Sequence, residues 1–379
     1  MQFCTGWRDG MNIEAKKVCK SFDGKQVLKN INIEIAESRI NCVIGPNGAG
    51  KTTLFKILTL LDRATSGEVY FDGSPSSLLS PEEKLKLRRR TGMVMQNPFM
   101  FNTSVWKNVA YGLKLRGDSD VAGKVEKGLK IVELYSLKEQ SALTLSSGEA
   151  QRVALARAMV LEPEVLFLDE PMANLDPLST KIIEGLILKM ESKYNVTIVL
   201  ATHNLLQARR FGERVFVLRQ GEIIQQGTAE EVFHYPNSSF AAEFVEVGNL
   251  FRGRLIIEQG TQKLDLGSIK VEVVPNSEFG KIGASVFATL RPEDILLSLE
   301  PFDSSARNSF LGEIRNMQDR GGIIWVTLEP IPRFSGSKAE SASTPFVAVI
   351  TKRSQEEMGL KVGMRVYFTF KASCVNVFE

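Results

Sequence analysis

The chain has 379 residues, of which 43% are hydrophobic, and a net charge of +3 from 47 basic and 44 acidic side chains. This length suggests two domains, or one domain with a sizeable extension. The nearly balanced charge gives no bulk electrostatic reason to expect a nucleic-acid partner.

The cysteine and hydropathy patterns narrow the cellular setting. Four scattered cysteines lack the paired spacing of a zinc site or a disulfide framework, so we expect a reducing cytosol. No apolar run approaches the roughly 20 residues of a membrane span, and the N-terminus lacks the pattern of a secretory signal. Any membrane association is therefore expected to come through a partner.

The first part of the chain alternates predicted strands and helices. Residues 1–10 lack periodicity and are interpreted as a loose tail before Met11. Strands are predicted at 12–18, 30–36 and 40–44, a helix at 51–61, and a strand at 68–71 before a turn at Asp72-Gly73. From about 97 to 144 the composition favours helices with breaks near Gly112, Gly117 and Gly123. We interpret this stretch as a helical insertion between two halves of a core.

The pattern then returns to alternating elements and later changes to short strands. A helix after Ser147 is followed by a strand at 165–168, a helix near 178–193 and a strand at 196–201. Such apolar strands indicate an α/β core with a mainly parallel sheet covered on both faces. After Asn249, short alternating strands predict a small all-β, OB-like barrel. The predicted domains are 11–240, with a helical subdomain at about 97–144, and 250–379; the serine-rich residues 334–344 are a predicted exposed loop.

The clearest chemical motif is a glycine-rich loop, GPNGAGKT, between a predicted strand and a predicted helix. Its glycines allow successive backbone N–H groups to converge on phosphate oxygens, and the helix N-terminus favours negative charge. Lys51 would neutralise β- and γ-phosphates, and Thr52 would offer its hydroxyl to Mg²⁺. The candidate nucleotide-binding residues are Gly45, Pro46, Asn47, Gly48, Ala49, Gly50, Lys51, Thr52 and Thr53.

Polar residues follow the other predicted core strands. Asp169 and Glu170 end an apolar run, where an open α/β sheet binds its ligand. Asp169 is placed to hold Mg²⁺, and Glu170 to act as general base on the attacking water. His203, just past the next strand, would contact the γ-phosphate, and Gln96 would reach Mg²⁺ or water. Taken singly, each of these residues would be an ordinary strand end or surface side chain.

In their order along the chain these motifs resemble the ATP-binding cassette (ABC) ATPase family, over roughly residues 12–235. The resemblance rests on GPNGAGKT, Gln96, LSSGE at 145–149, LFLDE at 166–170, the residues Ala173 to Asp176, and His203. It implies ATP as the nucleotide and Mg²⁺ as the cofactor, with Phe22 stacked on adenine. It also implies a head-to-tail homodimer in which Ser146, Gly148 and Asp176 serve the ATP held by the other subunit.

The LSSGE segment departs from the family's usual LSGGQ at two positions. Glu149 is a familiar variant, whereas Ser147 replaces a glycine. A side chain at 147 would cost energy if the backbone there had positive φ or approached another chain closely.

Further resemblances point to an importer. Apolar residues of the helical insertion resemble the subdomain whose groove receives a coupling helix from a membrane subunit, although some would pack its core; they are Pro98, Phe99, Met100, Phe101, Val105 and Trp106. The sequence Arg291 to Ile295, RPEDI, resembles an element of the β-domains attached to importer ATPases. The segments 304–308, 350–360 and 370–377 resemble a molybdate- or tungstate-binding, Mop-like module.

Short hydroxyl, amide and cationic groups in that module suit a compact tetrahedral dianion. The candidates are Ser305, Arg307, Asn308, Lys371 and Ser373, and the alternative is a β-domain that only braces a dimer. The resemblance implies a peripheral ATPase subunit at the cytoplasmic face of the membrane. Its partners would be a second copy, two permease subunits and, indirectly, an external oxyanion-binding protein. An importer for ferric iron, sulfate, polyamine or sugar, and a non-transport ABC ATPase, remain the alternatives.

Overall fold

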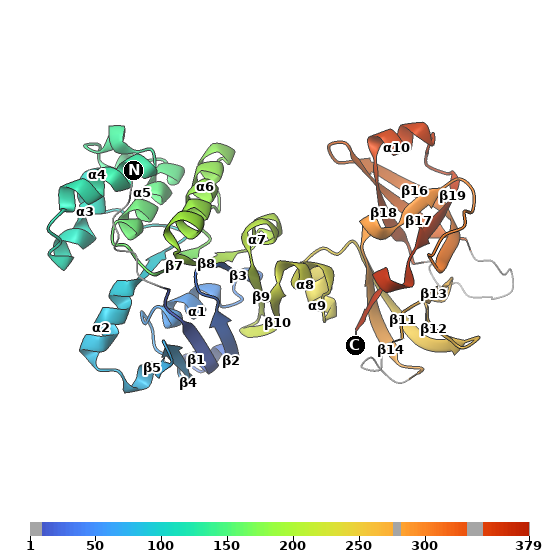
Figure 1. Ribbon diagram of the computed structural model, residues 1–379, viewed down its shortest axis with the longest axis horizontal. Helices are drawn as coiled ribbons and strands as arrows, with labels where there is room; N and C mark the ends of the chain where they lie inside the picture. Colours follow the sequence, from blue (N-terminus) through green and yellow to red (C-terminus); the bar gives the residue numbers. More distant parts are fainter. Residues whose placement is uncertain (1–9, 276–281, 332–343, 379) are drawn as a thin grey trace. The chain divides into compact units, whose positions relative to one another are not determined.

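The computed structural model describes residues 10–275, 282–331 and 344–378, which form two compact units divided between Ala229 and Glu230 (Figure 1). The tail up to residue 9 and nearly all of the serine-rich segment lie outside the described residues. The predicted extents 11–240 and 250–379 remain predictions. In the part of the chain that is described, no helix is both long enough and apolar enough to cross a membrane.

A six-stranded sheet in the order β10-β9-β3-β8-β7-β6 forms the centre of the first unit. Strands β6, β7, β8, β3 and β9 pair in parallel, and β10 is antiparallel to β9. All residues of β3, β7 and β8 are buried, which confirms the predicted α/β class. The bounds are β3 (Ile40–Ile44), β6 (Thr91–Val94), β7 (Val165–Asp169), β8 (Thr197–Thr202), β9 (Arg214–Arg219) and β10 (Glu222–Thr228).

A second, antiparallel sheet in the order β2-β1-β4-β5 packs over the same core. It contains β1 (Ile13–Phe22), β2 (Lys25–Ile35), β4 (Ser66–Phe71) and β5 (Ser74–Pro75). Strands β1 and β2 are longer than predicted, since they continue through irregularities in their register. Helix α1 (Lys51–Leu58) is shorter than predicted, because Leu60 takes a left-handed φ of 58°.

The helices of the first unit differ from the prediction in two respects. Gly117 ends α3 (Val105–Arg116), but Gly112 and Gly123 lie inside helices, so the breaks predicted there are wrong. Gly112 packs under Leu161, and the Gly123 N–H bonds to the N-cap carboxylate of Asp120. Helix α2 (Pro81–Arg90) was not predicted from the sequence. The remaining helices are α4 (Val121–Ile131), α5 (Ser147–Met159), α6 (Pro177–Tyr194) and α7 (Leu205–Phe211), with 3₁₀ turns at Tyr135–Leu137 and Ala142–Thr144.

The second unit is mostly β, as predicted, and its strands form two five-stranded sheets. Their orders are β13-β12-β11-β14-β20 and β15-β19-β16-β17-β18, and they share one core that includes Phe251, Phe346 and Phe368. The strands are β11 (Asn249–Glu258), β12 (Thr261–Asp265), β13 (Lys270–Glu272), β14 (Ser285–Leu290), β15 (Leu296–Ser298), β16 (Asn308–Asp319), β17 (Ile323–Pro330), β18 (Phe346–Thr351), β19 (Arg365–Phe370) and β20 (Asn376–Phe378). The helices are α8 (Ala229–His234), α9 (Ser239–Phe244) and α10 (Lys352–Glu357), with 3₁₀ turns at Pro292–Asp294 and Ala372–Cys374.

The two sheets of this unit have the same construction. β14 continues through the turn Pro292–Asp294 into β15 of the other sheet, and β19 continues through Ala372–Cys374 into β20 of the first sheet. Each sheet therefore ends in a strand supplied by the other, which ties the two sheets into one folding unit.

Candidate nucleotide-binding and hydrolytic site

The residues predicted to bind phosphate and to catalyse hydrolysis gather at one edge of the central sheet of the first unit. Because β3, β8 and β7 are parallel neighbours, their carboxyl ends lie at the same edge. The glycine-rich loop follows β3, Asp169 and Glu170 end β7, and His203 follows β8. This edge also carries a cavity of about 430 Å³, lined by Val27, Asn47, Gly48, Ala49, Gly50, Lys51, Thr52, Thr53, Gln96, Asp169 and Glu170.

The loop conformation requires glycine at two positions. Gly48 and Gly50 have φ values of 79° and 110°, in a region that side chains other than glycine rarely adopt. A Cβ atom on Gly50 would also lie only 2.8 Å from the side chain of Leu28. The backbone therefore bends sharply into α1, whose N-terminal N–H groups point into the cavity where a phosphate would sit.

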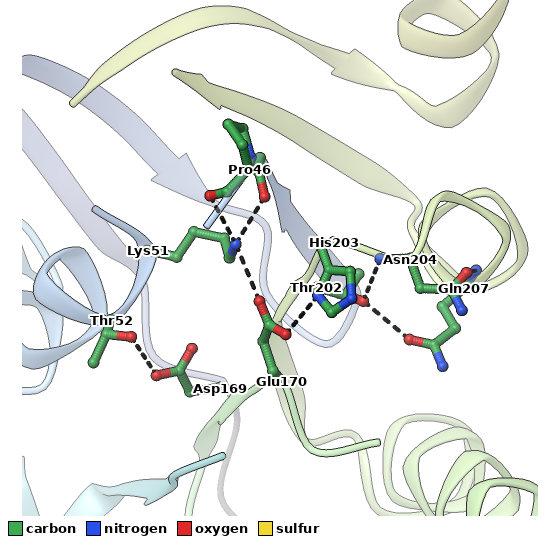
Figure 2. Close-up of polar contacts among 10 residues, drawn as sticks. Pro46, Lys51, Thr52, Asp169, Glu170, Thr202, His203, Asn204 and Gln207 are labelled. Carbon is green, nitrogen blue, oxygen red and sulfur yellow. Dashed lines mark hydrogen bonds and ion pairs between the residues drawn. The ribbon is translucent and has the colours of Figure 1, made fainter. Parts of the chain in front are cut away.

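Lys51 lies at the centre of the site and is only 6% exposed. Its Nζ donates to the carbonyl oxygens of Gly45, at 2.7 Å, and Pro46, at 3.2 Å. The same ammonium lies 3.1 Å from Glu170 Oε1 (Figure 2). A buried cation is costly unless it is paired and hydrogen-bonded, and here all three partners supply that compensation.

Glu170 connects the lysine to the histidine. Its Oε2 lies 2.6 Å from His203 Nδ1, while its Oε1 faces Lys51 (Figure 2). The residue is 7% exposed and has φ of 47°, and its N–H donates to the Ala201 carbonyl oxygen at 3.0 Å. A left-handed glutamate costs on the order of 1–3 kcal/mol. Such backbone strain is typical of a side chain that must be aimed into a site.

Residues that the sequence did not single out order the backbone on either side of His203. Thr202 Oγ1 donates to Gln207 and accepts from the Asn204 N–H, both at 3.0 Å (Figure 2). The Asn204 side chain in turn caps α7 by accepting from the N–H groups of Leu206 and Gln207. An N-cap asparagine before a helical run is a signal that could have been read from the sequence.

Thr52 and Asp169 form the second polar pair. Thr52 Oγ1 donates to Asp169 Oδ2 at 2.6 Å, and burial raises the pKa of Asp169 despite that hydrogen bond. Hydroxyl and carboxylate oxygens, with the Gln96 amide lining the same cavity, fit the oxygen preference of Mg²⁺. Within the described ranges no three His, Cys, Asp or Glu residues converge on a metal position. The phosphates of a bound nucleotide would supply the remaining ligands of a cation held here.

Gln96 follows β6 and is exposed at the cavity. The preceding carbonyl, that of Met95, accepts from the buried Gln151 of α5 at 3.4 Å. The loop that carries Gln96 thus touches the helix that begins at the LSSGE segment.

The start of α5 is a capping box. The Ser146 side chain accepts from the Glu149 N–H, and the Glu149 carboxylate accepts from the backbone and hydroxyl of Ser146. Ser147 is the first residue of the helix, is exposed and has no positive φ, so the cost of a left-handed conformation does not arise for it. The intolerant position is Gly148, where a Cβ atom would lie 2.2 Å from Ser179 Oγ.

Asp176 lies next to this turn through Ser179. Its carboxylate caps α6 by accepting from the N–H groups of Leu178 and Ser179, at 3.0 and 2.9 Å. Because Ser179 packs on Gly148, the structure brings together the three residues expected to serve a second subunit, Ser146, Gly148 and Asp176.

A larger cavity of about 1170 Å³ lies at the opposite edge of the sheet, where β6 and β7 begin. There Arg90 forms ion pairs with Glu164, at 2.7 Å, and Asp72, at 2.9 Å. This cavity is lined by neither the phosphate loop nor any of the predicted catalytic residues. We therefore interpret the ion pairs of Arg90 as structural links between neighbouring segments.

In the second unit, the candidate oxyanion residues separate into two kinds. Asn308 is 1% exposed, and its side chain pairs with both backbone groups of Glu272, at 2.7 and 2.9 Å, so it is committed to the fold. The other four, Ser305, Arg307, Lys371 and Ser373, are exposed. Asn308 pairs with Phe370, so Arg307 and Lys371 leave the β16–β19 ladder at the same end.

Comparison with known proteins found a matching family model in each of the two units. Residues 28–173 match the model described as ABC transporter, and residues 304–377 match the TOBE domain. The chain is 31% identical to the molybdate/tungstate import ATP-binding protein WtpC of Pyrococcus horikoshii, over 93% of this chain and 95% of that protein. It is 32% identical to the spermidine/putrescine import ATP-binding protein PotA of Trichormus variabilis, over 82% of each.

A solved structure supports the same likeness for the first unit. It is the dimer of the ATP-binding cassette MJ0796 in a post-hydrolysis state bound to ADP and phosphate. The TM-score is 0.54 at 30% identity, covering 57% of this chain and 98% of that one.

Proposed function

The chain belongs to the ABC transporter family as an ATP-hydrolysing import subunit with a TOBE domain, and from this premise we propose that it energises uptake of molybdate or tungstate. Two copies would pair at the cytoplasmic face of the membrane and act on two permease subunits, with an external protein delivering the oxyanion. The observation that carries the hydrolytic part is the placement of Glu170 between Lys51 and His203.

The arrangement suggests how the residues act when ATP enters the cavity. The phosphates would take the loop N–H groups and the Lys51 ammonium, which then leaves Glu170 for the more negative phosphate oxygens. Glu170 would keep its contact with His203 and turn its free oxygen to the attacking water. The water's proton would pass to that oxygen as the water attacks the γ-phosphorus, while the bond from this phosphorus to the β–γ bridging oxygen breaks and ADP leaves with that oxygen.

Thr52, Asp169 and Gln96 are the residues that would hold Mg²⁺. When bound, the ion neutralises charge on the phosphate oxygens. In this role Thr52 would exchange its hydrogen bond to Asp169 for the ion, and the ion would offset the cost of keeping Asp169 ionised while buried.

The second half of each site would come from a partner copy. Ser146 and Gly148 lie at the N-terminus of α5, which favours a phosphate, and Asp176 lies beside them. ATP bound between two copies would thus join them, and hydrolysis would release them.

The contact with the permease is proposed for the exposed aromatic surface of the helical subdomain. Phe99 is 72% exposed, and Phe101 packs on Tyr111 with their centroids 4.6 Å apart. Arg157 braces this surface by donating to the Phe99 carbonyl oxygen at 2.9 Å. Met100 and Val105, by contrast, are buried and belong to the subdomain core.

Oxyanion binding is proposed at the end of the β16–β19 ladder. Among the described residues, neither Arg307 nor Lys371 forms an ion pair, and Ser305 and Ser373 flank them with exposed hydroxyl groups. Two unpaired cations with neighbouring hydroxyls suit a compact dianion. Binding there would also provide feedback, if the anion favours one state of the dimer over the other.

Titration calorimetry of the full chain with molybdate, tungstate and sulfate tests the cargo. We expect binding of the first two and at least about tenfold weaker binding of the double variant Arg307→Met/Lys371→Met. The matched control is Lys352→Met, an exposed lysine on α10. Equal affinity for sulfate, or no binding, would favour an importer of another cargo whose β-domain only braces the dimer.

A further inference from the structure

The loop after α1 and the end of β1 are joined by hydrogen bonds that centre on Lys20. Lys20 Nζ donates to Asp62 Oδ1 and to the Arg63 carbonyl oxygen, both at 2.7 Å. Two backbone groups reinforce the junction: the Ser21 N–H donates to Thr65 Oγ1 at 3.0 Å, and the Thr65 N–H to the Cys19 carbonyl oxygen at 2.8 Å. The hydrogen bond from Lys20 holds the pKa of Asp62 below its usual value.

The same ammonium lies against one face of an aromatic ring. Lys20 Nζ is 4.7 Å from the centroid of the Phe22 ring, and the Lys20 side chain is only 11% exposed. Phe22 itself is 46% exposed and is the last residue of β1 before a tight turn at Asp23 and Gly24, both with positive φ. A cation whose position is fixed by two other oxygens therefore covers one face of the ring, while almost half of the Phe22 surface remains exposed.

We infer that Lys20 is a positioning residue for the nucleotide base, acting through Phe22. This rests on the proposed function, in which Phe22 stacks on adenine. A desolvated ammonium is held by the ring's quadrupole, so it limits rotation of the exposed side chain before ligand arrives. It also withdraws electron density from the ring, which favours stacking of an electron-rich purine on its exposed part.

This coupling connects the two ends of the nucleotide. Helix α1 begins at the phosphate loop, and the segment 62–65 that follows it holds Lys20 and Ser21. The Leu61 and Asp62 N–H groups both donate to the Lys56 carbonyl oxygen, which fixes that segment to the helix end. The Phe22 ring, on which the base would stack, is thereby connected through Lys20 to the helix that binds the phosphates.

A double-mutant cycle between Lys20 and Phe22 tests the inference. In the full chain with Mg²⁺, we compare the affinities for a non-hydrolysable ATP analogue and for inorganic tripolyphosphate, which lacks a base. We expect Lys20→Met to weaken binding of the ATP analogue about three- to tenfold and to leave tripolyphosphate binding unchanged. Lys20→Arg, which keeps the cation, should retain most of the affinity.

In a Phe22→Leu background, Lys20→Met should cause no further loss. Additive losses, equal losses for both ligands, or an unchanged affinity for the ATP analogue would overturn the role of Lys20. If Phe22→Leu alone leaves the affinity for the ATP analogue unchanged, adenine stacking fails first, and the inference fails with it. Melting temperatures of all variants separate loss of folding from loss of positioning.

Discussion

The nucleotide site of the first unit and the cationic end of the β16–β19 ladder in the second both present lysine to a proposed anion, but in opposite conditions. Lys51 is buried and already bonded to two carbonyl oxygens and to Glu170. Lys371 and Arg307 are exposed and form no ion pair among the described residues. The first site must exchange partners when its ligand binds, whereas the second gains them.

This difference has energetic consequences. Interactions at the buried site are strong, and removing one partner leaves the other uncompensated at a cost of about 3–5 kcal/mol. Exposed charges are screened by water and salt and contribute little until a ligand engages several of them. Substitutions should therefore have their largest effects in the first unit and smaller, ligand-dependent effects in the second.

The largest effect on ligand binding is expected for Lys51→Met. It removes the ammonium that faces the phosphates and leaves Glu170 buried beside an apolar side chain. We expect ATP affinity to fall by about 100-fold or more, with a loss of stability in the absence of nucleotide. Equilibrium binding and urea denaturation measure the two. ATP binding within about threefold of the wild type would contradict the comparison.

An intermediate effect is expected at Gly148, which packs closely on Ser179 in the first unit. Gly148→Ala places a Cβ atom 2.2 Å from Ser179 Oγ, so it should destabilise the chain by about 1–3 kcal/mol. The double variant Gly148→Ala/Ser179→Gly removes the clashing side chain and should recover most of that loss in urea denaturation. If the second substitution restores nothing, the contact is not the cause.

The smallest effect is expected for an exposed ion pair of the second unit. Glu258 bonds to Lys270 and Lys263, and these hydrogen bonds lower its pKa from 4.5 to about 2. A carboxylate whose pKa is lowered in the folded state stabilises the fold at any pH above its unfolded-state pKa. That contribution is lost as the pH falls from 4.5 toward 2. Glu258→Gln should thus lower the melting temperature slightly at pH 7 and not at all near pH 2. A large drop in melting temperature at pH 7 would show that the exposure of these ion pairs does not limit their contribution to stability.

The sequence predicted the phosphate loop because its signals are local. A buried strand, glycines and a lysine at fixed spacing identify the turn into α1 without knowledge of the rest of the fold. The same holds for Asp169, Glu170 and His203, whose common edge follows from parallel strands. The capping box of Ser80 and Glu83 that begins α2 was also local and could have been recognised.

The contacts that the sequence did not predict join distant segments. Lys51 and Glu170 are far apart in the sequence, so neither motif by itself reveals the ion pair between them. Gly112 and Gly123 were interpreted as breaks from composition alone, but packing against Leu161 and a bond to the Asp120 cap keep them helical. Asn308 resembled a ligand residue, although its two hydrogen bonds to Glu272 in another sheet commit it to the fold.

The most direct test of the account is ATP turnover by Glu170→Gln, with Glu164→Gln as its matched control. Both glutamates are buried and lie next to β7, but Glu164 precedes the strand, whereas Glu170 follows it, and Glu164 pairs with Arg90. We predict that Glu170→Gln binds ATP within about threefold of the wild type while turnover falls by about 10²–10⁴, and that Glu164→Gln keeps its turnover. Turnover of Glu170→Gln within about tenfold of the wild type would contradict the assignment of Glu170 as the general base.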